Sequence, residues 1–168
     1  QVLGASNAGT TAPATAPVSL DMNIKGGLDV NNDAKFHGNV WFYKLVTFVE
    51  KTVFNNDVTF AGHIQTDGAT PTVSVQAGDA TTTTTIDGND NSGQLVSNLT
   101  QAATSGQSIT VNFTKPYGKS PRVLLTPTNE SSAQLKYYVK STANGYKIFF
   151  AQDQPAGTQL EFNYLVVQ

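Results

Sequence analysis

The chain has 168 residues, enough for one domain of ordinary size or for two small ones. Its net charge is −2 and only 13% of its residues are charged, so neither a nucleic acid nor an anionic membrane is expected as a partner. It contains no Cys, which excludes disulfides, thiolate catalysis and Cys-based zinc sites. No apolar run is long enough to cross a membrane, so membrane insertion is not expected.

Residues 1–25 are interpreted as an extended N-terminal arm. The first seventeen are mostly Ala, Thr, Gly, Ser and Pro, and then apolar and polar residues alternate through Val18, Leu20, Met22 and Ile24. This alternation predicts one half-buried strand. The strand could add to the sheet edge of another copy, as a donor strand does, or pack on its own domain. The chain begins at Gln1, so we also expect a removed leader, unless the chain has been shortened.

Residues 26–67 carry a six-residue repeat. Its most regular position is aromatic, and an apolar or β-branched residue usually stands two positions earlier, while a turn former or a charge stands two positions later. The aromatic series is Phe36, Phe42, Phe48, Phe54 and Phe60; the turn series is Gly26, Asn32, Gly38, Lys44, Glu50, Asn56 and Gly62. A fixed period of this kind is typical of a repeat architecture.

The period excludes a helix, because residues six apart on a helix point about 240° away from each other. On an extended chain, all the even-numbered positions of the repeat face the same side. The sequence therefore predicts a β stem over residues 26–67. Two alternatives remain open: a solenoid wound within one chain, and a stem intertwined between several chains.

The middle of this segment is apolar on its other face as well. Where the ends of the repeat place Asp, Asn and Lys at odd-numbered positions, the middle places an apolar set: Trp41, Tyr43, Leu45, Val49 and Val53. If all of these side chains were exposed, they would form an apolar patch prone to aggregation, unless another subunit or the C-terminal part of the chain covered it. We expect a second copy to cover them, so these five residues and the arm strand form the predicted assembly interface.

Residues 68–93 are predicted to be a linker, with one short strand at 72–76 and a run of Thr. Within it, Asp87, Asn89 and Asn91 place oxygen atoms at alternate positions, as a calcium loop does. The match to a twelve-residue calcium loop fails at the sixth and twelfth positions of the loop, where this chain has Ser92 and Asn98 instead of Gly and Glu. A plain turn is the favoured interpretation, so no metal and no cofactor are expected.

Residues 94–168 are predicted to form an antiparallel β-sandwich, because short alternating strands are separated by turn signals throughout. Strands are expected at 107–114, 122–126, 135–140, 146–151 and 160–166, with Asn144-Gly145 as the strongest hairpin signal. No stretch shows helical spacing with capping residues. The whole chain is therefore expected to be all-β.

This region resembles the C-terminal β-sandwich heads of bacterial surface proteins and phage tail-fibre proteins. The resemblance is carried by a series of strand and turn motifs: ITVNF at 109–113, PY at 116–117, PRVLLTP at 121–127, YYV at 137–139, GYKI at 145–148 and FNYLVV at 162–167. The resemblance implies a repetitive β stem before the head and a trimeric or fibrous assembly. Phage fibre proteins are not secreted through a leader, so the expected removal of a leader favours resemblance to the bacterial cell-surface proteins.

Catalytic motifs are lacking. His37 and His63 each adjoin a turn glycine and could be read as a base or a zinc pair, but solvated repeat positions are favoured. Four tyrosines could stack on sugar rings and, together with Lys119, Arg122 and Lys136, form a glycan-binding surface: Tyr117, Tyr137, Tyr138 and Tyr146.

The sequence thus predicts a non-enzymatic, secreted structural protein of the cell surface that assembles by strand pairing into a filament. The alternative is a trimeric adhesin or fibre tip that recognises a surface glycan.

Overall fold

A computed structural model describes residues 24–75 and 82–168 of the chain. The chain divides into two units, Gln1–Asn56 and Asp57–Gln168, and each is considered by itself. The predicted arm strand through Val18, Leu20 and Met22 lies outside the described residues.

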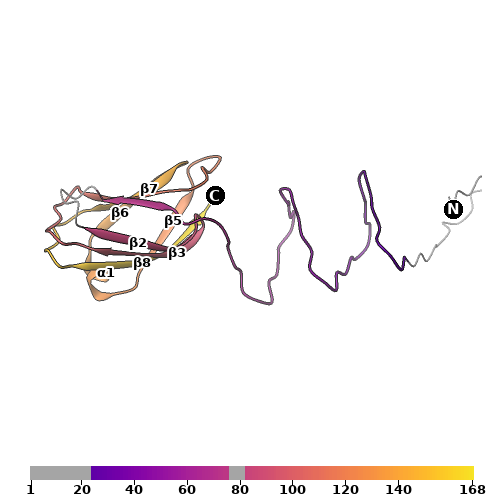
Figure 1. Ribbon diagram of the computed structural model, residues 1–168, viewed down its shortest axis with the longest axis horizontal. Coiled ribbons are helices and arrows are strands. Elements are labelled where there is room, and N and C mark those ends of the chain that lie inside the picture. The colour runs from indigo at the N-terminus through magenta and orange to yellow at the C-terminus, as the bar shows by residue number, and fades with distance from the viewer. Residues whose placement is uncertain (1–23, 76–81) are drawn as a thin grey trace, which may run out of the picture. The chain divides into compact units, whose positions relative to one another are not determined.

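From residue 24 to residue 71 the backbone is extended and contains no paired strand, and Figure 1 draws it without arrows. Its bends recur with the period of the sequence repeat. They fall at 25–26, 31–32, 37–38, 43–44, 50, 55–56 and 61–62. Every residue of the predicted turn series lies at one of these bends, so the six-residue unit of the sequence is also a unit of the backbone.

The described residues from 72 onward, 72–75 and 82–168, form two four-stranded antiparallel sheets, with strand orders β1-β4-β7-β6 and β2-β3-β8-β5 (Figure 1). This part is called the two-sheet domain below. The strands are β1 Thr72–Val75, β2 Thr83–Gly88, β3 Ser92–Asn98, β4 Ser108–Asn112, β5 Arg122–Pro127, β6 Tyr137–Thr142, β7 Gly145–Phe150 and β8 Gln159–Val167. The predicted all-β class is confirmed for the described residues.

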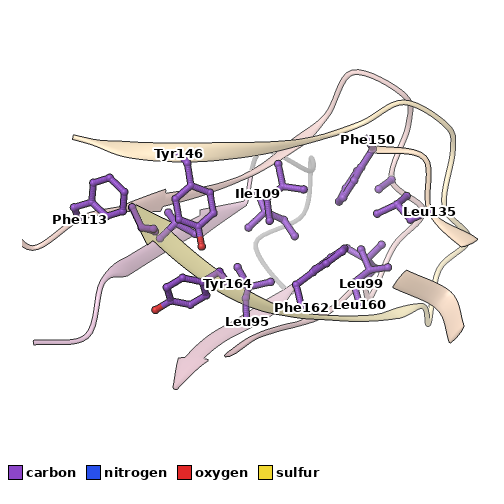
Figure 2. Close-up of a cluster of buried hydrophobic side chains, with 14 residues drawn as sticks. Leu95, Leu99, Ile109, Phe113, Leu135, Tyr146, Phe150, Leu160, Phe162 and Tyr164 are labelled. Atoms are coloured by element: carbon purple, nitrogen blue, oxygen red, sulfur yellow. The ribbon is translucent and has the colours of Figure 1, made fainter. Parts of the chain in front are cut away.

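The core of the two-sheet domain lies between the sheets, where inward-facing side chains of the alternating strands form one buried apolar cluster. In β8, Leu160, Phe162, Tyr164 and Val166 are buried, as the alternation predicts. Figure 2 shows Phe150 of β7 and Phe162 of β8 pointing toward one another across this core. The ring of Phe162 also meets Tyr137 edge-on, with centroids 5.1 Å apart.

The predicted boundary between linker and sandwich needs a correction. β1 and β2 lie within residues 68–93, yet β1 pairs with β4, and β2 pairs with β3 over six residue pairs from Thr83 to Gly88. The Thr run was assigned to the linker because it has few apolar residues, but Thr83, Thr84 and Thr85 belong to β2, which pairs with β3. Ile86 packs against the common core.

The expectation of no helix was also wrong. A five-residue helix, α1 (Glu130–Gln134), follows β5 and begins at Asn129, whose side-chain oxygen accepts a 2.9 Å hydrogen bond from the backbone N–H of Ser132. An Asn at this position satisfies one of the free N–H groups of the first turn. The helix is too short to show a period in the sequence.

Candidate functional site

The hexad segment, residues 26–67, exposes its repeated phenylalanines. The five Phe rings of the series are between 62% and 70% exposed, although each is large and apolar. Scattered exposed apolar residues are ordinary, whereas a regular row of them marks an interaction surface. The row is therefore a candidate interface.

The two sides of the hexad segment differ in exposure. Val46, at an even-numbered position, is 36% exposed, whereas Val49, at an odd-numbered position, is 92% exposed. The comparison is between side chains of the same size on the same extended backbone. The even-numbered valines of the hexad segment are thus less exposed than the odd-numbered ones, whereas the Phe rings on the even-numbered positions remain 62–70% exposed.

The apolar band, Trp41, Tyr43, Leu45, Val49 and Val53, is exposed throughout. Its residues stand at odd-numbered positions of the sequence and those of the Phe series at even-numbered positions. Whether the apolar band lies in an assembly interface stays a prediction.

The backbone of the hexad segment is also free to pair. Between residues 24 and 65, no residue that the structure describes forms a backbone hydrogen bond. Its N–H and C=O groups resemble those of an edge strand, which is a template for pairing with another chain. Hydrogen bonding begins at Thr66, close to the two-sheet domain.

The turn between β2 and β3, residues 88–92, is called the root turn because Thr66 binds to it. The side-chain amide of Asn89 donates hydrogen bonds to the carbonyl oxygen of Thr66 at 2.8 Å and to its hydroxyl at 3.1 Å. The hydroxyl of Thr66 lies 2.7 Å from that of Ser92. These bonds attach the C-terminal end of the hexad segment to the turn.

Asp90 joins the root turn to the loop that follows β4. Its carboxylate accepts hydrogen bonds from the N–H of Thr114 at 2.8 Å, the hydroxyl of Thr114 at 2.7 Å and the N–H of Lys115 at 2.9 Å. A hollow of about 450 Å³ lies beside this loop and is lined by Asp67, Asp90 and Tyr117, among others. Its polar groups are largely engaged with one another.

Of the three candidate calcium ligands, Asp87 is exposed at the end of β2, whereas Asn89 and Asn91 have other roles in the root turn. The side-chain oxygen of Asn89 accepts from the N–H groups of Asn91 and Ser92, and that of Asn91 accepts from the hydroxyl of Tyr117 at 2.7 Å. Across the described residues, no group of three or more His, Cys, Asp or Glu side chains is placed to hold a metal ion. The oxygens therefore stabilise a turn.

The four tyrosines considered for a glycan surface do not form one surface. Tyr146 is 1% exposed and Tyr137 packs on Phe162 in the core. Tyr117 is half-buried, and burial followed by the charge of Asp90 raises its pKa. Tyr138 alone among the four is exposed, on the outer face of β6. A surface built on all four is excluded, because alternation sends neighbouring tyrosines to opposite faces.

Tyr138 belongs instead to a group that the sequence did not reveal. Its ring stacks on Phe149 of β7, with centroids 5.0 Å apart and an interplanar angle of 9°. The ammonium group of Lys140 lies 5.7 Å from the Tyr138 ring centroid and 5.5 Å from that of Phe149. The register Tyr138↔Phe149 creates this group, and the register depends on the loop between the strands. The short loop between β6 and β7 fixes this register, so the Asn144-Gly145 hairpin signal in the sequence could have predicted that Tyr138 and Phe149 lie side by side.

His37 and His63 are both exposed and lie in different units of the chain. Among the described residues, no helix is long and apolar enough to span a membrane. Comparison with family models, with curated proteins and with solved structures finds no match to this chain.

Proposed function

We propose that this chain is a non-enzymatic structural protein of the cell surface whose hexad segment pairs with the hexad segments of other copies. The paired segments form the stem of a fibre, and the two-sheet domain is the head at one end. The single observation that carries the proposal is the hexad segment itself: a regularly bent, extended chain without pairing of its own.

Two forces favour assembly in this arrangement. Pairing between chains would satisfy backbone groups that water now solvates, and it would bury the Phe series. Removal of one Phe side chain from water contributes roughly 1.5–3 kcal/mol, and each added chain brings five such side chains. Ordering the segment costs conformational entropy, which pairing and burial against other chains would have to offset.

The lack of pairing within the chain favours the intertwined stem over the solenoid. A solenoid wound by one chain would hydrogen-bond each turn to the next, and the described residues 24–65 contain no such bonds. Strands from neighbouring copies would fill this role. The even-numbered side would then face the axis of the stem, with the Phe rings stacked along it.

The test is the mass of the full-length protein in solution, measured by light scattering at several concentrations. The wild-type chain is expected to be oligomeric. Replacing Phe42 and Phe48 together by Ser should give monomers, because the buried series loses two adjacent members. A second variant replaces Tyr43 and Val49 by Ser, two members of the apolar band that the sequence predicts to lie in the assembly interface, and it tests that band separately from the Phe series.

Each outcome has a definite meaning. Monomeric wild-type protein at all concentrations would contradict the proposal. If the variant with Tyr43 and Val49 replaced dissociates and the Phe variant does not, the apolar band is the interface between copies and the Phe series is not. Circular dichroism of both variants would verify that the two-sheet domain remains folded.

A second candidate function, glycan recognition by the head, is favoured by one observation. The outer face of β6 and β7 presents the stacked rings of Tyr138 and Phe149, and aromatic rings are the usual contact for the apolar faces of sugars. The two functions are compatible, because a fibre can carry a binding head at its end.

A further inference from the structure

The outer face of the sheet β1-β4-β7-β6 is cationic. Lys140 of β6 lies directly opposite Lys147 of β7, and both side chains are exposed. The sequences of the four strands, TVSV, SITVN, GYKIFF and YYVKST, contain no Asp or Glu. Like charges directly opposite each other on a sheet are destabilising, and here no carboxylate from these strands offsets them.

Within the part of the chain that the structure describes, Lys140 and Lys147 form no ion pair, although the protein as a whole has more acidic than basic groups. An uncompensated pair of ammonium groups in a net acidic protein is a feature that favours binding of an anion.

The same face has an aromatic wall. Phe149 stands next to the lysine pair, and stacking on Tyr138 holds its ring in place. Tyr138 itself is 45% exposed, and Lys140 lies near both rings. The face thus combines positive charge with flat apolar surface within one strand pair.

A hollow of about 260 Å³ opens between these groups. Its lining includes the two lysines, the ring of Phe149 and several neutral hydrogen-bonding residues: Thr110, Asn112, Thr142 and Asn144. Sites for small ligands combine an apolar surface with a few polar groups in this way, and the volume is just below their usual range of about 300–1,000 Å³.

We infer that this hollow binds an acidic saccharide, a sugar whose ring packs on Phe149 and whose carboxylate is bound by Lys140 and Lys147. The hydroxyl groups of the sugar would exchange hydrogen bonds with the Asn and Thr side chains. A nucleic acid fits less well, because two lysines neutralise too few phosphates to hold a polyanion.

The inference specifies the ligand class of the second candidate function and does not require assembly of the hexad segment. All of the lining residues belong to the two-sheet domain, and none of them to the hexad segment. The monomeric variant with Ser at positions 42 and 48 should therefore bind the ligand as the wild-type protein does, so failure of binding and failure of assembly are distinguished.

The test is calorimetric titration of the full-length protein with a trimer of galacturonic acid and with the neutral trimer of galactose. The acidic trimer should bind, and its affinity should fall as salt is added, since exposed charges are screened. The neutral trimer should bind at least tenfold more weakly. Lys140→Gln and Lys147→Gln should each weaken binding of the acidic trimer by about tenfold, because a charge-assisted contact is lost.

Two further variants sharpen the test. Tyr138→Ser removes an exposed ring that supports Phe149 and should weaken binding about fivefold by the loss of one aromatic contact. Lys119→Gln is the matched control, because Lys119 is an exposed lysine outside the hollow, and its affinity should equal that of the wild type.

Four results would overturn the inference. They are the absence of binding by the acidic trimer, equal binding of both trimers, unchanged affinity of both lysine variants, and an equal loss in the Lys119 control. A change in solution mass in Lys140→Gln or Lys147→Gln without a change in affinity would also overturn it, since the face would then be a contact between copies.

Discussion

The hydroxyl of Tyr164 donates a 2.6 Å hydrogen bond to the carbonyl oxygen of Asn89, a residue 75 positions earlier in the chain. The bond requires space beside Gly93, since a Cβ atom there would lie 2.7 Å from the Tyr164 hydroxyl and 2.4 Å from the carbonyl oxygen of Asp87. Tyr164 of β8 thus holds the root turn from inside the core, while Thr66 binds the same turn from outside.

Replacing each of the two core tyrosines by Phe should have opposite effects on stability. Tyr164→Phe removes the bond to Asn89 and should lower the free energy of unfolding by about 1–2 kcal/mol. Tyr146→Phe removes a buried hydroxyl that has no protein partner among the described residues, and should raise it by up to about 1 kcal/mol. Urea unfolding of both variants, with the wild type, measures the difference. Equal destabilisation by both changes would contradict these assignments.

Stability should fall in alkaline solution, from about pH 10 upward. Burial, followed by the charges of Asp90 and Asp87 and the nearby Tyr117, raises the pKa of Tyr164 to about 12, and burial raises the pKa of Tyr146 further. In the unfolded chain both groups ionise near pH 10. Their contribution is therefore complete below pH 10 and is lost as the pH rises through the folded-state pKa values.

The alkaline loss is measured as the free energy of unfolding at pH 8, 10 and 11. Tyr146→Phe should reduce the slope between pH 10 and pH 11, because one tyrosine then no longer ionises on unfolding. A slope that is unchanged in this variant would show that other groups cause the loss.

Removing the carboxylate of Asp90 should loosen the loop after β4. Asp90→Ala deletes three hydrogen bonds to Thr114 and Lys115 and should destabilise the protein by about 1–2 kcal/mol, less than the full value of three bonds because the site is partly solvated. Asp87→Ala is the control, since Asp87 is an exposed carboxylate three residues earlier, and should change stability by less than about 0.5 kcal/mol. A comparable loss of stability in both variants would show that the hydrogen bonds of Asp90 to Thr114 and Lys115 do not stabilise the loop after β4.

Deleting residues 1–24 should leave a discrete oligomer. Under the proposed function the hexad segment carries the pairing between copies, so its assembly does not require the arm. Light scattering and negative-stain images of the truncated protein are the measurements. Dissociation to monomers would show instead that the arm links the copies, as a donor strand does.

The strands of the two-sheet domain were predictable because alternation is a local property. The predicted strand at 160–166 lies within β8, and the strand at 122–126 lies within β5. The six-residue unit was equally local, since its turn residues coincide with the backbone bends. In both regions, side-chain size and turn preference act on the same few residues that the pattern describes.

Pairing across the sheet was less predictable. The Asn144-Gly145 signal located a hairpin, but Thr142 pairs with Gly145, so the loop itself is 143–144 and Gly145 begins β7. Gly is needed there for another reason: a Cβ atom would lie 2.1 Å from the carbonyl oxygen of Val111. That contact depends on β4, more than thirty residues earlier, and no short sequence window contains it.

The sugar site shows the same limit. The four tyrosines share a residue type that can bind sugars, but the position of each tyrosine in its strand decides whether its side chain faces water or the core. Tyr137 and Tyr138 are adjacent, and the first lies in the core while the second lies on the surface. Phe149 and Lys147 were not selected, because their proximity to Tyr138 and Lys140 follows from the register of β6 and β7.

The coincidence of bend and repeat makes the hexad segment modular in length. Insertion or removal of six residues keeps every Phe on its side and every turn residue at a bend, whereas a change of three residues exchanges the two sides. The near-duplication of residues 30–40 at 54–64, an offset of four units, fits growth by whole units. The length of such a segment can thus change in discrete steps while each step keeps the Phe series and the turn residues at their positions in the repeat.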